Sequence, residues 1–291
     1  MKTYLDCIPC FFRQALDAAR IAGTDEIKQK QIVDKISQLI PDFPLEASPP
    51  EMGREIHNLV GKISGVKDPF KEIKENSNKF ALKLYPKLKQ EINNSEDRLL
   101  TAVRLSIAGN VIDYGVKNSL NVEEEVNKIF NRDFKNDNEN RKTVFRYQEF
   151  KEILSKVNHV IYLADNAGEV VFDRLLIEEL TEKLGKQVIY MVRGKPIIND
   201  ALIEDAIFCG INKVAKIISS GSDAPGTILK YCSPEFIELY QKAELIISKG
   251  QGNYESLSEE DRPIFFLFRA KCPVIAEDVD CKVGDMVLVG R

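Results

Sequence analysis

Apolar residues are spaced differently in the two halves of the chain. In the first half they recur every three or four residues, the period of amphipathic helices, and no alternating strand pattern appears. Helices are predicted in residues 11–19, 32–40, 52–66, 70–84 and 99–116, the last of them mostly apolar and therefore expected to be buried. This half predicts an α-helical domain.

A polar segment then interrupts the pattern. Residues 131–142, NRDFKNDNENRK, have almost no apolar anchors, which predicts a linker and a domain boundary near residue 145. Beyond it, short apolar runs of strand length occupy residues 160–164, 188–192, 215–218, 245–247, 265–268, 274–276 and 286–289. Helical patterns separate the earlier runs, as in βαβ units. We therefore expect a helical domain (1–145), followed by a three-layer α/β/α domain with a mainly parallel, Rossmann-like sheet (146–291).

The segment HVIYLADNAGEVVFD, residues 159–173, joins a strand pattern to a helix pattern. The apolar run ends at Asp165 and Asn166, and after a small-residue turn Glu169 begins an amphipathic helix. Ligands of open α/β sheets bind at the carboxyl ends of strands, and a helix N-terminus favours anions. A carboxylate beside a carboxamide offers the hard oxygen ligands that Mg²⁺ or Mn²⁺ prefers. On these two residues alone, helix capping is an equally good explanation.

Three further loops with polar or small residues follow predicted strands. They are RGKPIINDALIEDA with Asp200, SSGSDAPGT with Gly221 and Ser222, and SKGQGNYE with Lys249, Gly250 and Asn253. Each loop alone fits an ordinary cap, turn or solvated lysine. Parallel topology brings all of them to one edge of the sheet, so we expect Asp165, Asn166 and Asp200 to form an oxygen-rich metal site. Lys249 and free loop N–H groups would hold a phosphate beside it.

The predicted buried helix contains IAGNVIDYG, which places Asn110 and Asp113 on one helical face. Buried polar residues are costly unless paired. They either face a cleft between the two halves or form a hydrogen bond that packs the helix, and the sequence leaves both explanations open.

Composition excludes several classes of protein. With 41 basic and 45 acidic residues the net charge is −4, which gives no basic face for nucleic acid. No apolar run approaches the ~20 residues of a membrane span, and the N-terminus lacks a signal-peptide core, so we expect a cytoplasmic protein. The two histidines, His57 and His159, argue against a His-ligated zinc enzyme, and His159 is expected at the surface opposite the site.

The six cysteines are too few and scattered for a disulfide scaffold. Cys7 and Cys10 form a single CxxC. Zinc would need two more ligands, for which only Cys272 and Cys281 are conceivable, and a thioredoxin-like role would need a preceding strand. Buried thiols or an occasional disulfide are the favoured interpretation.

Taken together, DNAGE, PIIND, SGSDAPGT, SKGQGN and AGNVIDYG resemble the damage-control phosphatase family, which also carries an acidic-residue methyltransferase annotation. The CIPC segment followed by Gln14 resembles its small prokaryotic branch. The resemblance implies a metal-dependent phosphatase of sugar phosphates or damaged phosphometabolites, with an α/β/α core. It matches the metal ligands to Asp165, Asn166 and Asp200, the phosphate-contacting lysine to Lys249, and the cleft residues to Asn110 and Asp113.

We therefore expect hydrolysis of a small phosphomonoester with one divalent ion, Mg²⁺, Mn²⁺, Co²⁺ or Ni²⁺. The substrate-binding residues expected are Asn110, Asp113, Glu169, Gly221, Ser222, Gly250 and Asn253. Glu169 or Asp113 would orient the water or protonate the leaving group. Activated water is preferred to Asp165 as the nucleophile, because the haloacid dehalogenase pattern has a second Asp where this chain has Ala167.

Two alternatives belong to other classes of protein. An S-adenosylmethionine-dependent carboxyl methyltransferase would fit the family's second annotation, although GxGxxG is absent after the first predicted strand. A non-catalytic metal- or metabolite-binding module would use the same loops without turnover. The expected partner is a small phosphorylated metabolite, with no nucleic acid and no membrane, and the oligomeric state stays open.

Overall fold

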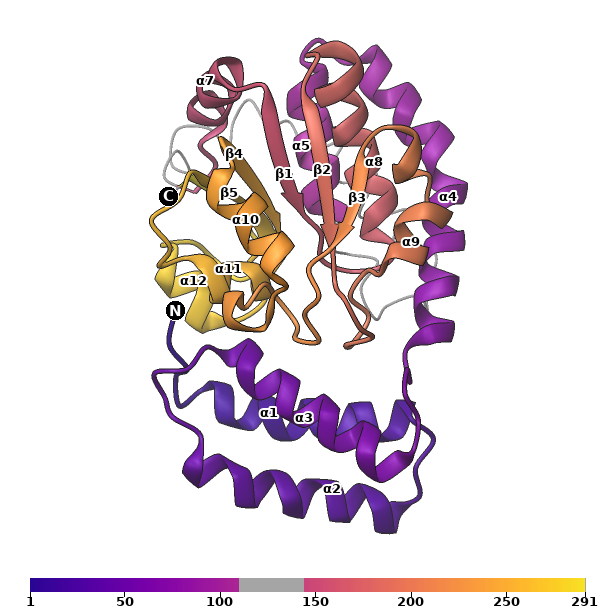
Figure 1. Cartoon of the computed structure of the whole chain (residues 1–291), viewed down its shortest axis with the longest axis vertical. Helices are drawn as coiled ribbons and strands as arrows, with labels where there is room; N and C mark the ends of the chain where they lie inside the picture. The colour runs from indigo at the N-terminus through magenta and orange to yellow at the C-terminus, as the bar shows by residue number, and fades with distance from the viewer. Residues whose placement is uncertain (110–143, 291) are drawn as a thin grey trace.

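A six-stranded sheet with strand order β3-β2-β1-β4-β5-β6 forms the centre of the computed structural model, which describes residues 1–109 and 144–290 (Figure 1). The strands are β1 (His159–Leu163), β2 (Gln187–Val192), β3 (Lys216–Ser219), β4 (Leu245–Lys249), β5 (Ile264–Arg269) and β6 (Met286–Gly290). Neighbouring strands from β3 to β5 pair in parallel, and β6 pairs antiparallel with β5. The predicted mainly parallel sheet is confirmed.

Alternate residues of β1 belong to two different cores. Val160 and Tyr162 lie in the larger hydrophobic cluster on one face of the sheet, and Ile161 and Leu163 lie in a second cluster on the other. A strand buried on both faces needs a continuous apolar run, which is the pattern that the sequence has here. His159, at the opposite end of β1 from the site, is exposed as predicted.

Helices cover both faces of the sheet and complete the α/β/α arrangement. The sheet half contains α7 (Tyr147–Lys156), α8 (Glu169–Glu178) with its π-helical extension η3 (Glu179–Lys183), α9 (Ile203–Phe208), α10 (Pro234–Lys242), α11 (Gln251–Leu257) and α12 (Pro273–Asp278). Short 3-10 turns occupy Ile211–Lys213 and Leu229–Tyr231. The strand predicted at 274–276 is wrong: these residues lie in α12. Pro273 occupies its first turn, where a missing N–H costs nothing and the fixed φ suits a helix.

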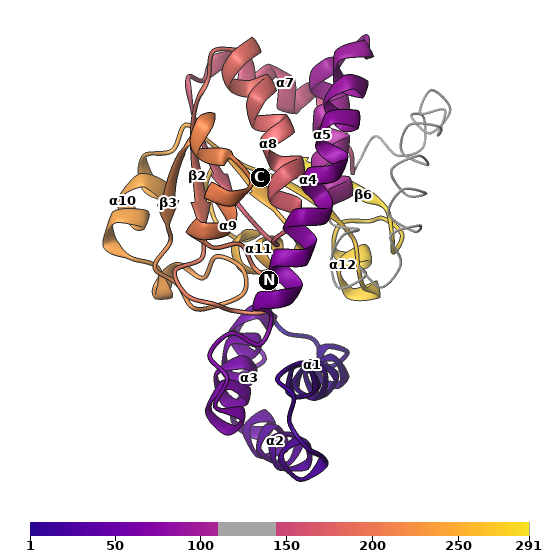
Figure 2. The same ribbon diagram turned by 90° about the vertical axis from the view of Figure 1, so that its right-hand side faces the viewer.

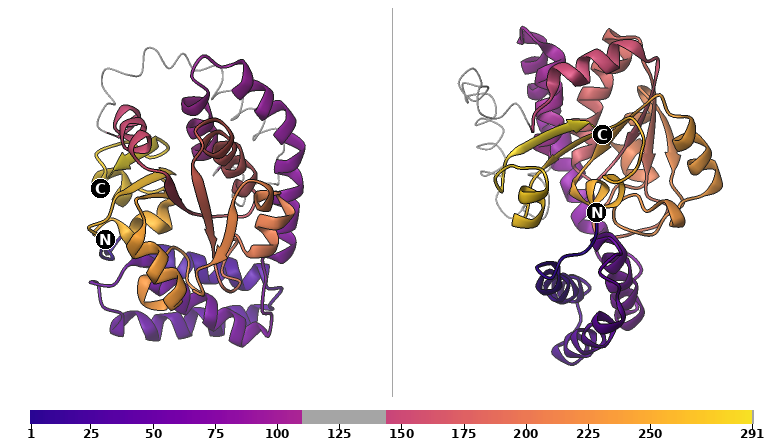
Figure 3. Two further views of the ribbon diagram at one scale, coloured as in Figure 1. Left: turned by 45° about the horizontal axis from the view of Figure 1, so that its top comes forward. Right: turned by 90° about the vertical axis from the view of Figure 1, so that its left-hand side faces the viewer.

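The first three helices form a layer of their own beneath the sheet (Figure 3). They are α1 (Cys7–Ile21), α2 (Glu26–Leu39) with the 3-10 turn Ile40–Asp42, and α3 (Pro49–Ser64). Their apolar stripes meet in a separate cluster that includes Ile32, Ile36 and Ile56. A capping box of Ser48 and Glu51 begins α3, and it satisfies backbone N–H groups that a helix N-terminus leaves unpaired.

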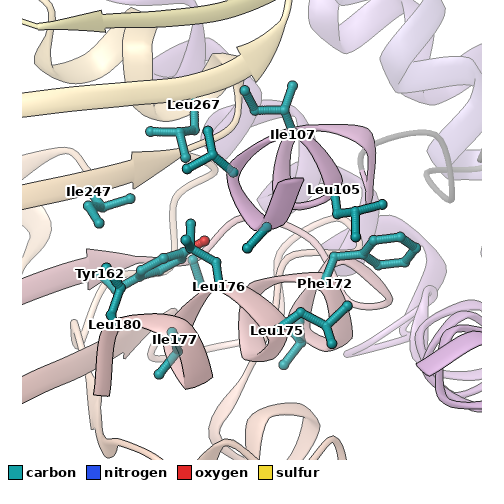
Figure 4. Close-up of a cluster of buried hydrophobic side chains, with 14 of the residues drawn as sticks. Leu105, Ile107, Tyr162, Phe172, Leu175, Leu176, Ile177, Leu180, Ile247 and Leu267 are labelled. Carbon is teal, nitrogen blue, oxygen red and sulfur yellow. The ribbon is translucent and has the colours of Figure 1, made fainter. Parts of the chain in front are cut away.

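Helix α4 (Lys71–Asn94) runs from this layer along the side of the sheet (Figure 2). Together with α5 (Arg98–Ala108) it packs against α8 and joins the larger core, where side chains of α5, α8 and the strands meet (Figure 4). The predicted burial of residues 99–116 holds for the part of α5 from Leu105 to Ala108. Helices α4 and α5 share the core of the sheet, whereas α1–α3 have a core of their own. The domain boundary at residue 145 stays a prediction.

The chain also pairs with its own last strand. The N–H of Arg146 donates to the carbonyl of Leu288 at 2.8 Å, and the N–H of Leu288 donates to Val144 at 2.8 Å. These bonds lie on the side of β6 away from β5, so the segment before α7 covers that edge of the sheet. In the described part of the chain, no helix is long and apolar enough to span a bilayer.

Candidate active site

The candidate site lies where the strand order reverses, between the carboxyl ends of β1 and β4. Asp165 and Asn166 follow β1, and Lys249 is the last residue of β4. This is the topological switch point at which open α/β sheets bind their ligands. Helix α8 begins at Glu169, so its N-terminus lies beside the same edge and favours negative charge there.

Backbone hydrogen bonds hold the loop after β2 against the loop after β1. Asn166 and Asp200 form an isolated antiparallel bridge. The N–H of Ala201 donates to the carbonyl of Asp165 at 2.8 Å, and the N–H of Ala167 donates to Asn199 at 2.9 Å. The structure therefore brings together the three residues that the sequence nominated from two separate strand ends.

Negative charge is concentrated in this loop pair. Asp165 is only 8% exposed, and its burial, followed by the nearby charges of Glu169 and Asp200, holds the pKa of its carboxyl well above the ordinary value. The Asn166 amide donates to Asp165 at 2.9 Å and to Glu169 at 3.0 Å. Such crowding of carboxylates favours a bound cation.

The side chains do not already surround a metal ion. Within residues 1–109 and 144–290, no three His, Cys, Asp or Glu side chains are gathered as a metal-binding group. The expected set contains only two such residues, Asp165 and Asp200, with the amide of Asn166 as the third. The metal site stays a prediction.

Lys249 lies beneath the carboxylates rather than at the surface of the loop. Its ammonium is completely buried and donates to Asp173 at 2.7 Å and to Glu169 at 3.1 Å. Burial alone would lower the pKa of Lys249, but the two carboxylates outweigh it and raise the pKa. In this arrangement Lys249 compensates buried negative charge, and its predicted contact with a phosphate is not tested.

Asp173 is the centre of the buried polar network around Lys249. Besides Lys249, it accepts hydrogen bonds from Tyr162 and Tyr190, both at 2.8 Å, and from Ser106 at 3.2 Å. Sequence analysis placed Asp173 in the motif but gave it no role. Its signal was an acidic residue four positions after Glu169, one turn along a helix of mainly apolar residues.

Arg193 is a buried residue that sequence analysis missed. Its guanidinium donates to Asp200 at 2.7 Å, to Thr227 at 3.1 Å and to the Asn253 side chain at 3.1 Å. Asn253 in turn donates to the carbonyls of Ala164 and Lys249, at 3.0 and 2.6 Å. Arg193 therefore fixes the orientation of Asp200, and Asn253 connects the ends of β1 and β4. The available signal was an arginine directly after an apolar strand.

Close backbone approach explains two of the glycine positions. Gly250 has a φ of +84°, and a Cβ there would lie 2.0 Å from the carboxylate of Asp165. A Cβ on Gly194 would lie 2.5 Å from the backbone of Gly221. Any side chain at either position would push apart the loops that form the site.

Four of the loop amides expected to be free already donate hydrogen bonds within the chain. The N–H groups of Gly221, Ser222 and Ala224 donate to the hydroxyls of Ser219, Ser220 and Ser222, and the N–H of Gly250 donates to the carbonyl of Leu267. Short serine side chains fold back onto their own loop, a competition that the sequence pattern does not reveal. Gly221, Ser222 and Gly250 shape the edge of the site with their N–H groups already engaged.

Lys271 is a second residue that the sequence analysis did not nominate. It lies just after β5, at the carboxyl edge, where its side chain is exposed. Its positive charge lowers the pKa of both Asp165 and Glu169, partly opposing the effect of their burial. The backbone N–H of Lys271 donates to the Gln251 side chain at 2.9 Å, which connects it to the first residue of α11.

The remaining candidates lie outside the site or outside the described residues. Asn110 and Asp113 belong to the part of the chain that the structure does not describe, so their predicted cleft role is untested. All six cysteines are free thiols. Cys7 is partly buried, which raises the pKa of its thiol, whereas Cys10 is exposed and does not fit the expected buried thiol.

Comparisons with known proteins agree along the whole chain. A damage-control phosphatase from Archaeoglobus fulgidus is 36% identical over 99% of this chain and 98% of its own length. Damage-control phosphatase PH1575 from Pyrococcus horikoshii is 35% identical over 99% of this chain and 97% of its own length. An uncharacterized protein, MJ0202, from Methanocaldococcus jannaschii is 40% identical over 100% of this chain and 96% of its own.

A solved structure shares the fold. The crystal structure of the DUF89 family protein PH1575 from P. horikoshii matches with a TM-score of 0.88 and 33% identity, covering 100% of this chain and 99% of that one. The branch assignment from the CxxC segment stays a prediction. The model of the damage-control phosphatase ARMT1-like domain matches residues 3–287, and the chain therefore belongs to that family.

Proposed function

We propose that this protein is a metal-dependent phosphatase that hydrolyses small phosphomonoesters, sugar phosphates or damaged phosphometabolites. Membership of a family whose close relatives are named damage-control phosphatases supports a phosphatase role in general. The observation that carries the metal-dependent reaction is the crowding of Asp165, Asn166 and Asp200 at the β1/β4 switch point.

The residues present fit a hard divalent ion. Asp165 and Asp200 offer carboxylate oxygens, and because the Asn166 NH₂ group donates to carboxylates, its carbonyl oxygen is left as a possible ligand. The pKa of Asp165 is raised first by burial and then by the charges of Glu169 and Asp200, and a cation bound beside these carboxylates would offset their repulsion. A bound Mg²⁺, Mn²⁺, Co²⁺ or Ni²⁺ would neutralise charge on the phosphate oxygens and polarise the phosphorus for attack by water.

The chain also supplies charge and position around the phosphate. Arg193 holds the Asp200 carboxylate in one orientation, which pre-organises it as a ligand. Lys271 is the exposed cation whose charge acts on Asp165 and Glu169, so it can attract an anionic substrate to this edge. Lys249 keeps Glu169 and Asp173 compensated beneath the site.

Glu169 can transfer a proton at its carboxyl oxygens. Burial raises the pKa of Glu169 and the charge of Lys249 lowers it. Its pKa therefore lies above the ordinary value but below that of a carboxyl buried without a cation. It would orient the attacking water or protonate the leaving oxygen. Asp113 remains the other candidate for this role, and it lies outside the described residues.

Phosphate release is the measurement that tests this function. A panel of sugar phosphates and p-nitrophenyl phosphate is incubated with each of the four ions and with a chelator. We expect ion-dependent release that Asp165→Asn reduces at least about a thousandfold, since a ligand carboxylate is lost while the side-chain shape is kept. Asp34→Asn, an exposed Asp on α2, is the matched control and should retain full activity.

Other results would redirect the proposal. Phosphate release that a chelator does not diminish would show that the reaction does not require a metal ion. Trapping of a phosphorylated Asp165 would replace water by Asp165 as the nucleophile. Absence of release with every ion would favour the binding module, and tight, metal-independent binding of S-adenosylmethionine would favour the methyltransferase.

A further inference from the structure

A cavity of about 450 Å³ lies between the helical layer and the sheet, to one side of the candidate site. Its walls come from α3, from the α3–α4 connection, and from the loops that follow β2 and β3. Buried Val60, Phe70 and Ile197 give it an apolar floor. This volume and this mixture of an apolar lining with a few charged groups are typical of small-molecule sites.

Two walls of the cavity are the loops that carry the candidate site. Residues 195–198 line it, and the same loop continues directly into Asp200. Asp223 lines it from the loop of Gly221 and Ser222. Because β2 and β3 lie beside β1 in the sheet, the cavity is on the β2 and β3 side of the β1/β4 switch point. In such folds one ligand commonly spans the carboxyl edge over neighbouring strands.

The walls are fixed in place. Arg54 of α3 donates two hydrogen bonds to Asp223, at 2.6 and 3.1 Å, which ties the helical layer to the β3 loop. Ile198 has a φ of +45°, unfavourable for a branched residue, and packs against the apolar cluster of α1–α3. Strain of this kind persists where the surroundings over-determine a conformation, and it is concentrated at ligand clamps.

The unbalanced charge in the cavity is positive. Both acidic residues are already paired inside the protein, Asp223 with Arg54 and Asp68 with Lys74 at 2.9 Å. The two lysines of the lining, Lys67 and Lys195, are exposed and have no carboxylate of the described residues within 4 Å, although the charge of Lys195 contributes to lowering the pKa of Asp223. A ligand that fills the apolar floor and reaches these ammonium groups would carry an anionic group.

We infer that this cavity receives the end of the substrate remote from the hydrolysed phosphate, and that this end carries a second anionic group on a less polar body. The inference rests on the proposed phosphatase function. It narrows the substrates to metabolites that carry an anionic group at each end. Lys195 is the specificity-determining residue, since it lies in the loop that also carries Asp200.

A matched pair of substrates tests this inference. Hexyl phosphate and 1,6-hexanediol bisphosphate share the apolar body and the scissile group and differ only in the second anion. For the full-length protein we expect a KM for the bisphosphate about tenfold lower than for the monophosphate. Lys195→Gln should remove most of that tenfold difference while the KM for hexyl phosphate and both kcat values stay within about twofold.

Lys62→Gln is the matched control, because Lys62 is an exposed lysine of α3 outside the cavity lining. It should leave the KM of both substrates unchanged. Equal KM values for the two substrates, or equal effects of Lys195→Gln on both, would overturn the inference while the phosphatase function stands. An effect of Lys62→Gln as large as that of Lys195→Gln would also overturn it, since general charge rather than the cavity would then be responsible.

A calorimetric titration separates this inference from the proposed function. If hexyl phosphate and p-nitrophenyl phosphate are not hydrolysed with any ion, the phosphatase function fails on its own. Titration of 1,6-hexanediol bisphosphate into the wild-type protein and into Lys195→Gln then measures ligand binding in the cavity directly. A Kd about tenfold weaker in the variant supports an anion-binding cavity, and equal or undetectable binding overturns it.

Discussion

The chain buries two clusters of opposite chemistry. At the β1/β4 edge, Glu169, Asp173 and Lys249 are all at most 1% exposed. In the α1–α3 layer the buried cluster consists of apolar residues such as Ile32 and Val60, both fully buried. An apolar cluster stabilises through burial and packing alone, whereas a buried ion network is often no more stable than its apolar replacement. The edge network is therefore expected to serve the reaction, and the part of the helical cluster away from the cavity, around Ile32 and Ile36, to serve the fold.

The largest expected effect comes from breaking the edge network. Lys249→Met keeps the length of the side chain but leaves Glu169 and Asp173 buried without their cation. We expect the free energy of unfolding to fall by about 4 kcal/mol, because an uncompensated buried charge remains. Urea denaturation measures it. Lys242→Met, at an exposed lysine, should change stability by less than about 0.5 kcal/mol, and equal effects would remove the contrast.

A substitution in the helical cluster should lower the free energy of unfolding without changing kcat. Ile32→Ala is expected to lower the free energy of unfolding by about 3 kcal/mol, since it opens a cavity among fully buried side chains. The kcat of the folded protein should stay the same. Ile27→Ala, on the same helix but 80% exposed, should be nearly neutral. A kcat lowered by Ile32→Ala would show that the two regions are not separable.

A titrating group also lies in the helical layer. Burial lowers the pKa of His57 from 6.5 to about 4, so the unfolded chain binds more protons than the folded chain between these values. Stability should therefore be complete above pH 6.5 and decrease as the pH falls to 4, by roughly 3 kcal/mol from this residue. Urea midpoints measured from pH 7 to 4 test it. His57→Gln should flatten the curve, and His159→Gln, at an exposed histidine, should leave it unchanged.

The smallest expected effect is a gain in stability. Asp165→Asn removes one of three crowded carboxylates, so without metal we expect about 1 kcal/mol of stabilisation although activity is lost. Added Mn²⁺ should raise the Tm of the wild type and not that of the variant, because a ligand stabilises only the state that binds it. A variant that is less stable than the wild type in metal-free buffer would contradict this account.

The sequence predicted the parts of the molecule that depend on local pattern. Apolar runs located β1 to β6 and the parallel topology then placed Asp165 and Asp200 at one edge. The run at 274–276 misled the analysis because three apolar residues after a proline suit either a strand or a helix.

The partners of the polar side chains could not be predicted in the same way. That Lys249 pairs with Asp173 depends on α8 packing beneath β4, a tertiary contact without a local signal. Arg193 reaches Asp200, seven positions away, only because the loop between them folds back on itself. The serine hydroxyls that occupy the loop amides are decided by rotamers, which residue type alone does not fix.

The pairing of residues 144–146 with β6 bears on self-association. A sheet edge with unpaired N–H and C=O groups can template a strand from another copy, which is a route to aggregation. Here the bonds from Arg146 and Leu288 already use that edge, so an incoming strand would first have to displace the chain's own segment. The opposite edge of the described sheet, β3, has only four residues and begins with Lys216, and a short edge strand with a lysine is a poor template for another strand. Both edges of this sheet are thus protected against intermolecular strand addition.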